Sequence, residues 1–195
     1  MNIFITGTDT DVGKTVVSSW ICRHTDAQYW KPIQTGDDSD TATVQKFSPS
    51  TKVLQNAYKL KAPLSAYDAA KRENITIEEE KIINMCPQNS TVIEGAGGSL
   101  VPITNDIMMA DLINKLNAKV IIVAKSQLGF LNHIFLTVEA LKSRGVDIIG
   151  IILNGKTDLI DTIEKFSKCK ILASLTSLDD IKTKNLPPII GKYFI

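Results

Sequence analysis

The chain has 195 residues, of which 44% are hydrophobic and 22% are charged, a composition typical of one globular domain and not of a disordered chain. Its 22 basic and 21 acidic side chains give a formal net charge of +1, which excludes the strongly basic surface expected for nucleic-acid or anionic-membrane partners. No apolar run approaches the roughly 18–20 residues that span a bilayer, so we expect no membrane partner and no nucleic-acid partner.

Short apolar runs, which we interpret as buried strands, alternate along the chain with segments of helical spacing. In chain order we expect a strand at 2–6, a helix at 14–24, a strand at 28–32, a polar loop at 34–40 and a helix ending near residue 46. Residues 48–62 show no regular pattern, and helices are expected at 66–72 and 77–85. The rest should form a strand at 91–94, a helix at 107–116, a strand at 118–124, a helix at 132–144, a strand at 146–153, a helix at 159–167 and a strand at 170–173. Beyond residue 178, Pro187 and Pro188 should prevent a helix.

Uniformly apolar strands that alternate with amphipathic helices are typical of a parallel sheet covered on both faces. We therefore predict a single P-loop α/β domain over residues 1–195. Ligands of such sheets bind outside the carboxyl ends of the strands. The polar residues that stand out collect at those ends, at 7–15, 31–40, 94–98, 125–132 and 154.

The three cysteines, Cys22, Cys86 and Cys169, lie far apart and have no metal-ligand spacing. Free thiols of this kind are typical of a reducing compartment, and the N-terminal sequence lacks the basic region and cleavage site of a signal peptide. We therefore expect a cytoplasmic protein in which the cysteines are small buried side chains.

Residues 7–15 read GTDTDVGKT and join the first strand to the first helix, as a phosphate-binding loop does. In such a loop backbone N–H groups surround an anion at the positive end of the helix, Lys14 reaches the terminal phosphates, and the hydroxyl of Thr15 binds Mg²⁺. The first glycine stands one position earlier than usual, and Asp9 and Asp11 lie inside the loop, where their roles stay open. The alternative interpretation is a chance Gly-Lys-Thr in a turn.

A nucleotide-bound Mg²⁺ is a hard cation that also takes carboxylate oxygens, and two carboxylates are candidates. Glu94 ends a strand, and a turn of small residues that would let phosphate come close follows it. That turn comprises Gly95, Ala96, Gly97 and Gly98. Asp40 lies in the polar stretch after the second strand, where Asp37 and Asp38 compete for the same role. The alternatives are a solvated strand-end carboxylate for Glu94 and a helix N-terminal carboxylate for Asp40.

Lys31 stands between Trp30 and Pro32 at the end of a buried strand. A lysine there either extends along the sheet edge to reach solvent or points its cation into the ligand pocket. In the second case it forms a clamp with Lys14 around an anionic group that receives a phosphoryl group. Lys31 therefore indicates phosphoryl transfer to a second substrate and not nucleotide hydrolysis alone.

Taken together, GTDTDVGKT, WKPIQTG, the following DSD, VIEGAGG, LGFLNH and ILNG resemble the dethiobiotin synthetase family in their order and approximate spacing, from residue 2 to about residue 155. The set is not shared with generic P-loop ATPases. ATPases of chromosome partitioning and septum placement are related, but they usually carry a second lysine early in the loop, where this chain reads TDTD.

The resemblance implies a role for each matching position. The ATP-binding residues would be Asp11, Val12, Gly13, Lys14, Thr15, Val16, Asp40, Glu94, Gly95, Ala96, Gly97 and, at the adenine, Asn154. Thr15, Asp40 and Glu94 would hold Mg²⁺. Lys31 would be the catalytic lysine, assisted by Lys14. The substrate would contact Thr10, Lys31 and Thr35, and its carboxylate tail would meet the loop 128–133 of a partner subunit, through Gly129, Phe130, Leu131 and Asn132.

The implied activity is ATP-dependent ring closure by a homodimer. The diamine 7,8-diaminononanoate would take up CO₂ as a carbamate, the carbamate would be phosphorylated by ATP, and the second amine would close the ureido ring of dethiobiotin. The sequence departs from the family pattern at 172–177, which lacks the usual proline near the base, so the choice of nucleoside triphosphate stays open. Two rival functions remain: a partitioning-type ATPase switch, and a related amidoligase or kinase of the same fold.

Overall fold

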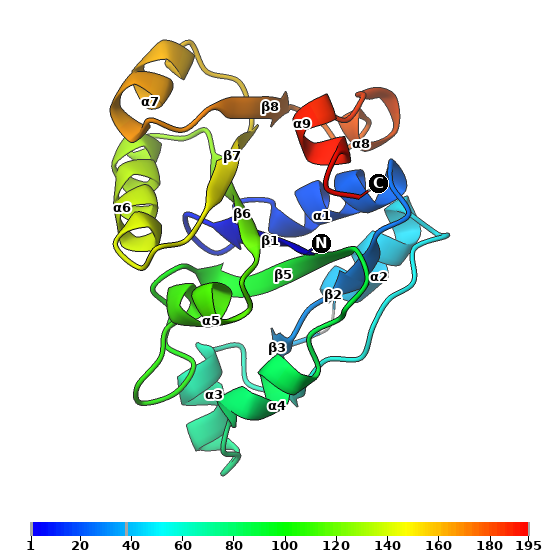
Figure 1. The fold of residues 1–195 in the computed structure, drawn as a ribbon, viewed down its shortest axis with the longest axis vertical. Helices are drawn as coiled ribbons and strands as arrows, with labels where there is room; N and C mark the ends of the chain where they lie inside the picture. The colour runs from blue at the N-terminus through cyan, green and yellow to red at the C-terminus, as the bar shows by residue number, and fades with distance from the viewer. Residues whose placement is uncertain (1, 38, 195) are drawn as a thin grey trace.

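The computed structural model describes residues 2–37 and 39–194, which form the α/β arrangement shown in Figure 1. The strands are β1 (Asn2–Gly7), β2 (Gln28–Trp30), β3 (Ile33–Thr35), β4 (Tyr58–Leu60), β5 (Thr91–Gly98), β6 (Lys119–Lys125), β7 (Ile148–Asn154) and β8 (Ile171–Leu175). The helices are α1 (Lys14–Arg23), α2 (Ser39–Phe47), α3 (Ala66–Arg72), α4 (Glu79–Asn84), α5 (Met109–Lys115), α6 (Phe130–Lys142), α7 (Ile160–Ser167), α8 (Asp180–Thr183) and α9 (Pro188–Gly191).

Six strands form one sheet in the order β2-β5-β1-β6-β7-β8, and all of their pairings are parallel. The predicted fold class is thereby confirmed. Because consecutive parallel strands need crossover connections, helices cover both faces of the sheet. The carboxyl ends of β1, β5 and β7 therefore meet at one edge, where the residues singled out in the sequence lie.

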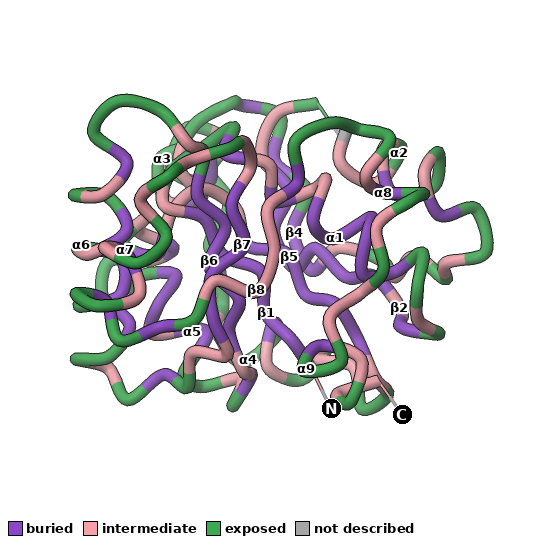
Figure 2. Tube along the Cα trace, turned by 90° about the horizontal axis from the view of Figure 1, so that it is seen from above, coloured by how far each residue is buried: buried purple, intermediate pink, exposed green. Residues whose placement is uncertain are grey.

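Side chains alternate between the two faces of each strand, and this alternation divides the core into two layers. Phe4 belongs to the core layer that also contains side chains of α3, α4, α5, α6 and α7, whereas its neighbours Ile3 and Ile5 belong to the layer that contains side chains of α1, α2, α8 and α9. In Figure 2 the central strands β1, β5 and β6 run as mostly buried segments through the middle of the molecule, the edge strand β8 is mostly of intermediate burial, and exposed segments surround them. A sheet buried on both faces explains why its strands are apolar at nearly every position.

The polar stretch and the irregular region of the sequence contain two short strands that the pattern did not predict. β3 pairs with β4 in a separate two-stranded parallel sheet, with Ile33 opposite Tyr58. The backbone N–H groups of Ala57 and Tyr58 both donate to the carbonyl of Pro32, at 2.8 and 3.0 Å. Three-residue strands carry too little periodicity to be recognised locally, so tertiary contacts decide their conformation.

The expectation that two prolines prevent a C-terminal helix was wrong. Pro188 occupies the first position of α9, where its missing N–H is not needed and its fixed φ suits the helix. Ile181 of α8 and Ile190 of α9 are fully buried against the α1 face, and the indole N–H of Trp20 donates to the carbonyl of Lys184 at 2.9 Å. Within the described residues, no helix has the length and apolar content required to cross a membrane.

Candidate active site

A cavity of about 710 Å³ opens at the carboxyl ends of the parallel strands. It is lined by residues from five separate parts of the chain: Thr10, Asp11, Gly13, Lys14, Thr15, Val16, Lys31, Gln34, Thr35, Asp37, Asp40, Pro63, Leu64, Ser65, Ala66, Glu94, Ala96, Gly97, Val101 and Asn154. Most of the residues predicted to bind nucleotide, metal or substrate thus share one cavity. Asp38, the alternative to Asp40, lies outside the described residues.

The loop between β1 and α1 has the geometry of an anion site. Its last glycine, Gly13, has φ 104°, in the left-handed region that favours glycine, and no side chain caps α1. The first turn of α1 also carries no acidic residue, so its N–H groups and its positive dipole end are free to face a phosphate. Asn154, at the end of β7, contacts this loop, because its side-chain amide donates a hydrogen bond to the backbone carbonyl of Val12 at 3.1 Å. The strand–loop–helix context argues against a chance Gly-Lys-Thr.

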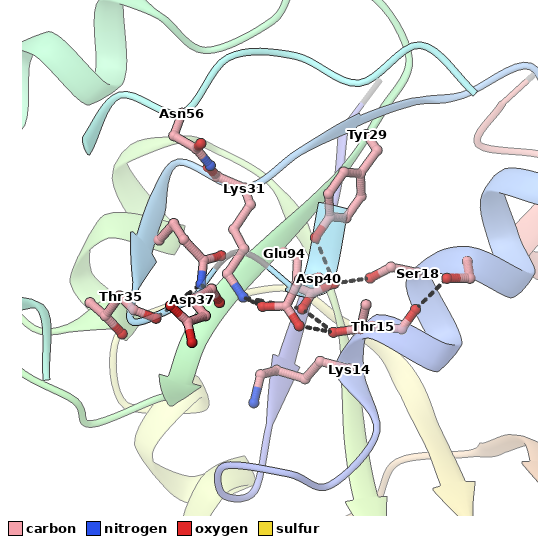
Figure 3. Close-up of polar contacts among 12 residues, drawn as sticks. Lys14, Thr15, Ser18, Tyr29, Lys31, Thr35, Asp37, Asp40, Asn56 and Glu94 are labelled. Atoms are coloured by element: carbon pink, nitrogen blue, oxygen red, sulfur yellow. Dashed lines mark hydrogen bonds and ion pairs between the residues drawn. The ribbon is translucent and has the colours of Figure 1, made fainter. Parts of the chain in front are cut away.

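Thr15, Asp40 and Glu94 converge on the cavity floor, as Figure 3 shows. The hydroxyl of Thr15 lies 2.8 Å from Asp40 Oδ1 and 2.8 Å from Glu94 Oε1. Lys31 contributes its ammonium, which pairs with Asp40 Oδ2 and lies 3.5 Å from Glu94 Oε1. One hydroxyl and one ammonium therefore bridge two carboxylates that are 54 residues apart in the sequence.

The interpretation of Glu94 as a solvated strand-end carboxylate is wrong, because β5 continues to Gly98 and Glu94 is 1% exposed. Its second oxygen, Oε2, accepts hydrogen bonds from two residues that no sequence motif singled out. Ser18 Oγ donates to Glu94 Oε2 at 2.7 Å, and the Tyr29 hydroxyl donates to the same oxygen at 3.1 Å. A buried carboxylate needs such donors, but which donors reach it depends on the packing of α1 and β2 against β5.

The charges of the site shift the pKa values of its ionisable groups. Burial alone would lower the pKa of Lys31, but the carboxylates of Glu94 and Asp40 outweigh it and raise that pKa. Burial would raise the pKa of Asp40, and the nearby Lys31 ammonium reverses the effect and lowers it. For Lys14 burial prevails, and its pKa is lowered. Burial and then the charge of Glu94 raise the pKa of Tyr29 well above its usual value, so its hydroxyl stays protonated.

The oxygen cluster suits a Mg²⁺ ion. Mg²⁺ binds through one or two carboxylates and completes its shell with waters and substrate phosphates. Asp40 and Glu94 supply two carboxylates, and the Thr15 hydroxyl lies within hydrogen-bond distance of both. Within the described ranges, no group of three or more His, Cys, Asp or Glu side chains is arranged to hold a metal ion.

Several predicted residues do not line the cavity. Val12 and Gly95 are buried in the core, where a side chain on Gly95 would collide with the Phe4 ring. Only residues 128 and 129 of the predicted partner loop 128–133 form a turn, because α6 begins at Phe130, whose side chain is buried in the core. The four predicted contact residues of this segment, Gly129, Phe130, Leu131 and Asn132, all lie outside this cavity.

Part of the cavity lining was not predicted as binding residues from the sequence. It consists of Gln34 in β3, the segment Pro63–Ala66 at the start of α3, and Val101 after β5. Gln34 stands inside the WKPIQTG motif, and Asp37, which also lines the cavity, was an alternative to Asp40, but no motif marks the segment Pro63–Ala66 or Val101. The pairing of β3 with β4, which sets Thr35 opposite Leu60, brings the segment Pro63–Ala66 to the site.

Comparisons with known proteins decide the family. A family model described as an AAA domain matches residues 1–185. A relative from Lawsonia intracellularis, named ATP-dependent dethiobiotin synthetase, is 45% identical over 194 residues, which cover 96% of this chain and 95% of the relative. A relative of the same name from Paramagnetospirillum magneticum is 39% identical over 193 residues, covering 95% and 94%. The chain belongs to the dethiobiotin synthetase family.

Membership of the dethiobiotin synthetase family confirms the resemblance seen in the sequence motifs and extends it into the C-terminal third. A solved ParA family ATPase from Chlorobium tepidum covers 98% of the chain with a TM-score of 0.59, but it is only 14% identical. That likeness confirms the P-loop fold and carries no function. The partitioning-type alternative is therefore not favoured over dethiobiotin synthetase.

Proposed function

We propose that this protein is an ATP- and Mg²⁺-dependent cyclo-ligase that converts 7,8-diaminononanoate and CO₂ into dethiobiotin. The observation that carries the proposal is the position of Lys31. Its buried ammonium lies on the cavity floor beside the metal-ligand candidates Asp40 and Glu94, and Lys14 lines the same cavity. A hydrolytic switch has no need of this second lysine, whereas phosphorylation of a small anionic substrate does.

The chemistry has three steps. One amine of the substrate adds to CO₂ and loses a proton, giving a carbamate. A carbamate oxygen then attacks the γ-phosphorus of ATP and expels ADP, giving a carbamic–phosphoric anhydride. The second amine attacks the carbonyl carbon, closes the five-membered ring and expels phosphate. The attacking amine loses a proton in this step, and ring closure is intramolecular because the activated carbonyl is already bonded to the first amine of the same molecule, which the cavity would hold in the reactive orientation.

Lys31 and Lys14 stabilise the negative charge of these steps. The raised pKa of Lys31 keeps it an ammonium, so it faces the carbamate and the transferred phosphoryl group as a cation. Lys14 is held by the carbonyl of Asp9 at 3.0 Å, which directs its amine across the phosphate loop. The N–H groups at the start of α1 surround the remaining phosphate oxygens.

Thr15, Asp40 and Glu94 would hold the Mg²⁺ ion. When bound, this ion neutralises charge on the phosphate oxygens of ATP and polarises them. Thr10 and Thr35 line the same cavity and would contact the substrate near its nitrogen atoms. Asn154 would face the adenine, and the unusual stretch 172–177 leaves other bases as competitors.

A second copy of the chain would complete the site. Leu128, Gly129 and Asn132 are exposed and lie outside the cavity, so these positions are free to meet the carboxylate tail of a substrate bound by a partner subunit, whereas the Phe130 side chain is buried in the core and would contribute only its backbone. We accordingly propose a homodimer. A cytoplasmic location is supported by Cys22, Cys86 and Cys169, which are all free thiols.

Mass spectrometry of the reaction products tests the proposal. Purified protein is incubated with 7,8-diaminononanoate, bicarbonate, Mg²⁺ and each of the four common nucleoside triphosphates in parallel. Dethiobiotin with ATP alone supports the proposal in full, and dethiobiotin with several nucleotides supports the chemistry but not the adenine contact. No dethiobiotin with any nucleotide overturns the proposal in favour of a related amidoligase or kinase.

The variant Lys31→Gln separates the cyclo-ligase from a nucleotide switch. It should abolish ring closure while the affinity for ATP, measured by calorimetry, survives. Normal turnover by this variant would remove the main argument for the mechanism.

A further inference from the structure

Glu94 is held through both of its carboxylate oxygens, and the two oxygens face different surroundings. Oε1 lies at the cavity floor, within 2.8 Å of the Thr15 hydroxyl and 3.5 Å of the Lys31 ammonium. Oε2 is turned into the protein, where it accepts the hydrogen bonds of Ser18 and Tyr29. Figure 3 shows these two hydroxyls on the side of Glu94 away from Lys31.

We propose that Tyr29 and Ser18 are positioning residues that hold Glu94 in the orientation in which one oxygen serves the Mg²⁺ ion, an inference that rests on the proposed function. Ser18 lies one helical turn after Thr15 on α1, so the same helix supplies a candidate metal ligand and a support for the second ligand. Tyr29 comes from β2, which pairs directly with β5, the strand of Glu94.

Both supports are themselves fixed. Tyr29 and Ser18 are fully buried, and the backbone of Tyr29 is clamped by hydrogen bonds with Lys52 and Leu54 at 3.0 and 2.9 Å. A carboxylate without these two donors could rotate and exchange its oxygens. Groups that orient metal ligands in this way typically change metal affinity or activity by about 10–100-fold when removed.

The test compares Tyr29→Phe with Tyr58→Phe as a matched control. Each variant removes one buried phenolic hydroxyl and keeps the ring. The Tyr58 hydroxyl accepts a hydrogen bond from the backbone N–H of Glu78 at 2.9 Å and plays no part in the metal site. Binding of Mn²⁺ in the presence of ADP is measured by electron paramagnetic resonance, and binding of ADP in EDTA is measured by calorimetry.

We expect Tyr29→Phe to weaken Mn²⁺ binding about 10-fold, and Tyr29→Phe with Ser18→Ala to weaken it further, up to about 100-fold. The KM for Mg²⁺ should rise as the Mn²⁺ affinity falls, while the affinity for ADP in EDTA and the KM for the diamine stay unchanged. Tyr58→Phe should leave the Mn²⁺ affinity within about twofold of the parent protein.

Unchanged Mn²⁺ affinity in both Tyr29 variants would overturn the positioning role, even if dethiobiotin is formed normally. Equal losses in Tyr29→Phe and Tyr58→Phe would also overturn it, since a general loss of packing would then explain both. The Mn²⁺ measurement needs no diamine, so a failure of the proposed cyclo-ligase activity is seen separately, as absent product with intact metal binding.

Discussion

Replacement of Lys31 by methionine tests the charge balance of the site. Methionine keeps an unbranched side chain but removes the ammonium shared by Asp40 and Glu94. Loss of one partner from a buried ion pair costs about 3–5 kcal/mol, because the other charge is left buried and unpaired. The Asp40 side chain is 24% exposed and recovers part of its hydration, so we expect the lower end, a loss of about 3 kcal/mol.

A divalent cation should reverse this loss, because it would bind the same carboxylates that the ammonium leaves unpaired. A ligand at about 100 times its Kd adds about 2.7 kcal/mol to the stability of the folded state. We therefore expect Mg²⁺ to stabilise Lys31→Met far more than the parent protein, in which the ammonium competes for Asp40 and Glu94. Ring closure should nevertheless fall by about 10³-fold or more, since the cation facing the carbamate is gone.

Urea denaturation with EDTA and with Mg²⁺ measures both effects, and Lys115→Met is the matched control. Lys115 pairs with Glu79 at 2.6 Å on the surface, and exposed pairs contribute only about 0–1 kcal/mol. Equal destabilisation of the two variants, or equal stabilisation of Lys31→Met and the parent protein by Mg²⁺, would refute the reasoning.

Three further predictions concern single features of the site. Thr15→Val keeps the shape of the side chain but removes the hydroxyl that joins the carboxylates of Asp40 and Glu94. The Kd of Mg²⁺–ATP, measured by calorimetry, should therefore rise at least about 10-fold, whereas Thr15→Ser keeps a hydroxyl and should bind Mg²⁺–ATP with the affinity of the parent protein. Because the pKa of Asp40 is lowered, its pairing with Lys31 stabilises the fold fully above about pH 4 and loses this effect as the pH falls through the lowered folded-state pKa. Urea midpoints at falling pH should show this loss in the parent protein and not in Lys31→Met. Gly13→Ala forces a side chain onto φ 104°, within 2.6 Å of a neighbouring amide, and should abolish ATP binding. Gly129→Ala is the matched control, because it carries the same left-handed backbone strain at φ 89° but meets no atom within 4 Å and lies outside the cavity, so it should leave ATP binding unchanged.

Much of the main sheet could be predicted from the sequence because its strands are buried on both faces. The runs around Phe4, Val120 and Ile151 are apolar at nearly every position, and their alternation with amphipathic helices is typical of a parallel sheet between two helical layers. The loop before Lys14 was recognisable for a different reason. A phosphate site needs its glycine, lysine and hydroxyl at fixed spacing, so local sequence carries the whole signal.

Only the tertiary structure shows which residues bring the two carboxylates of the candidate site together and which residues hydrogen-bond to Glu94. Asp40 and Glu94 are conspicuous in the sequence, but their sharing of Lys31 and Thr15 results from the strand order that places β2 beside β5. Tyr29 and Ser18 read as ordinary core residues, and they become supports of Glu94 only when β2 and α1 pack around β5. A phosphate ligand requires certain residue types at fixed spacing along the chain, so a local motif reveals its site. The hydrogen-bond partners of a buried carboxylate come from segments that are distant in the sequence, and no local pattern in a single sequence predicts which segments will meet.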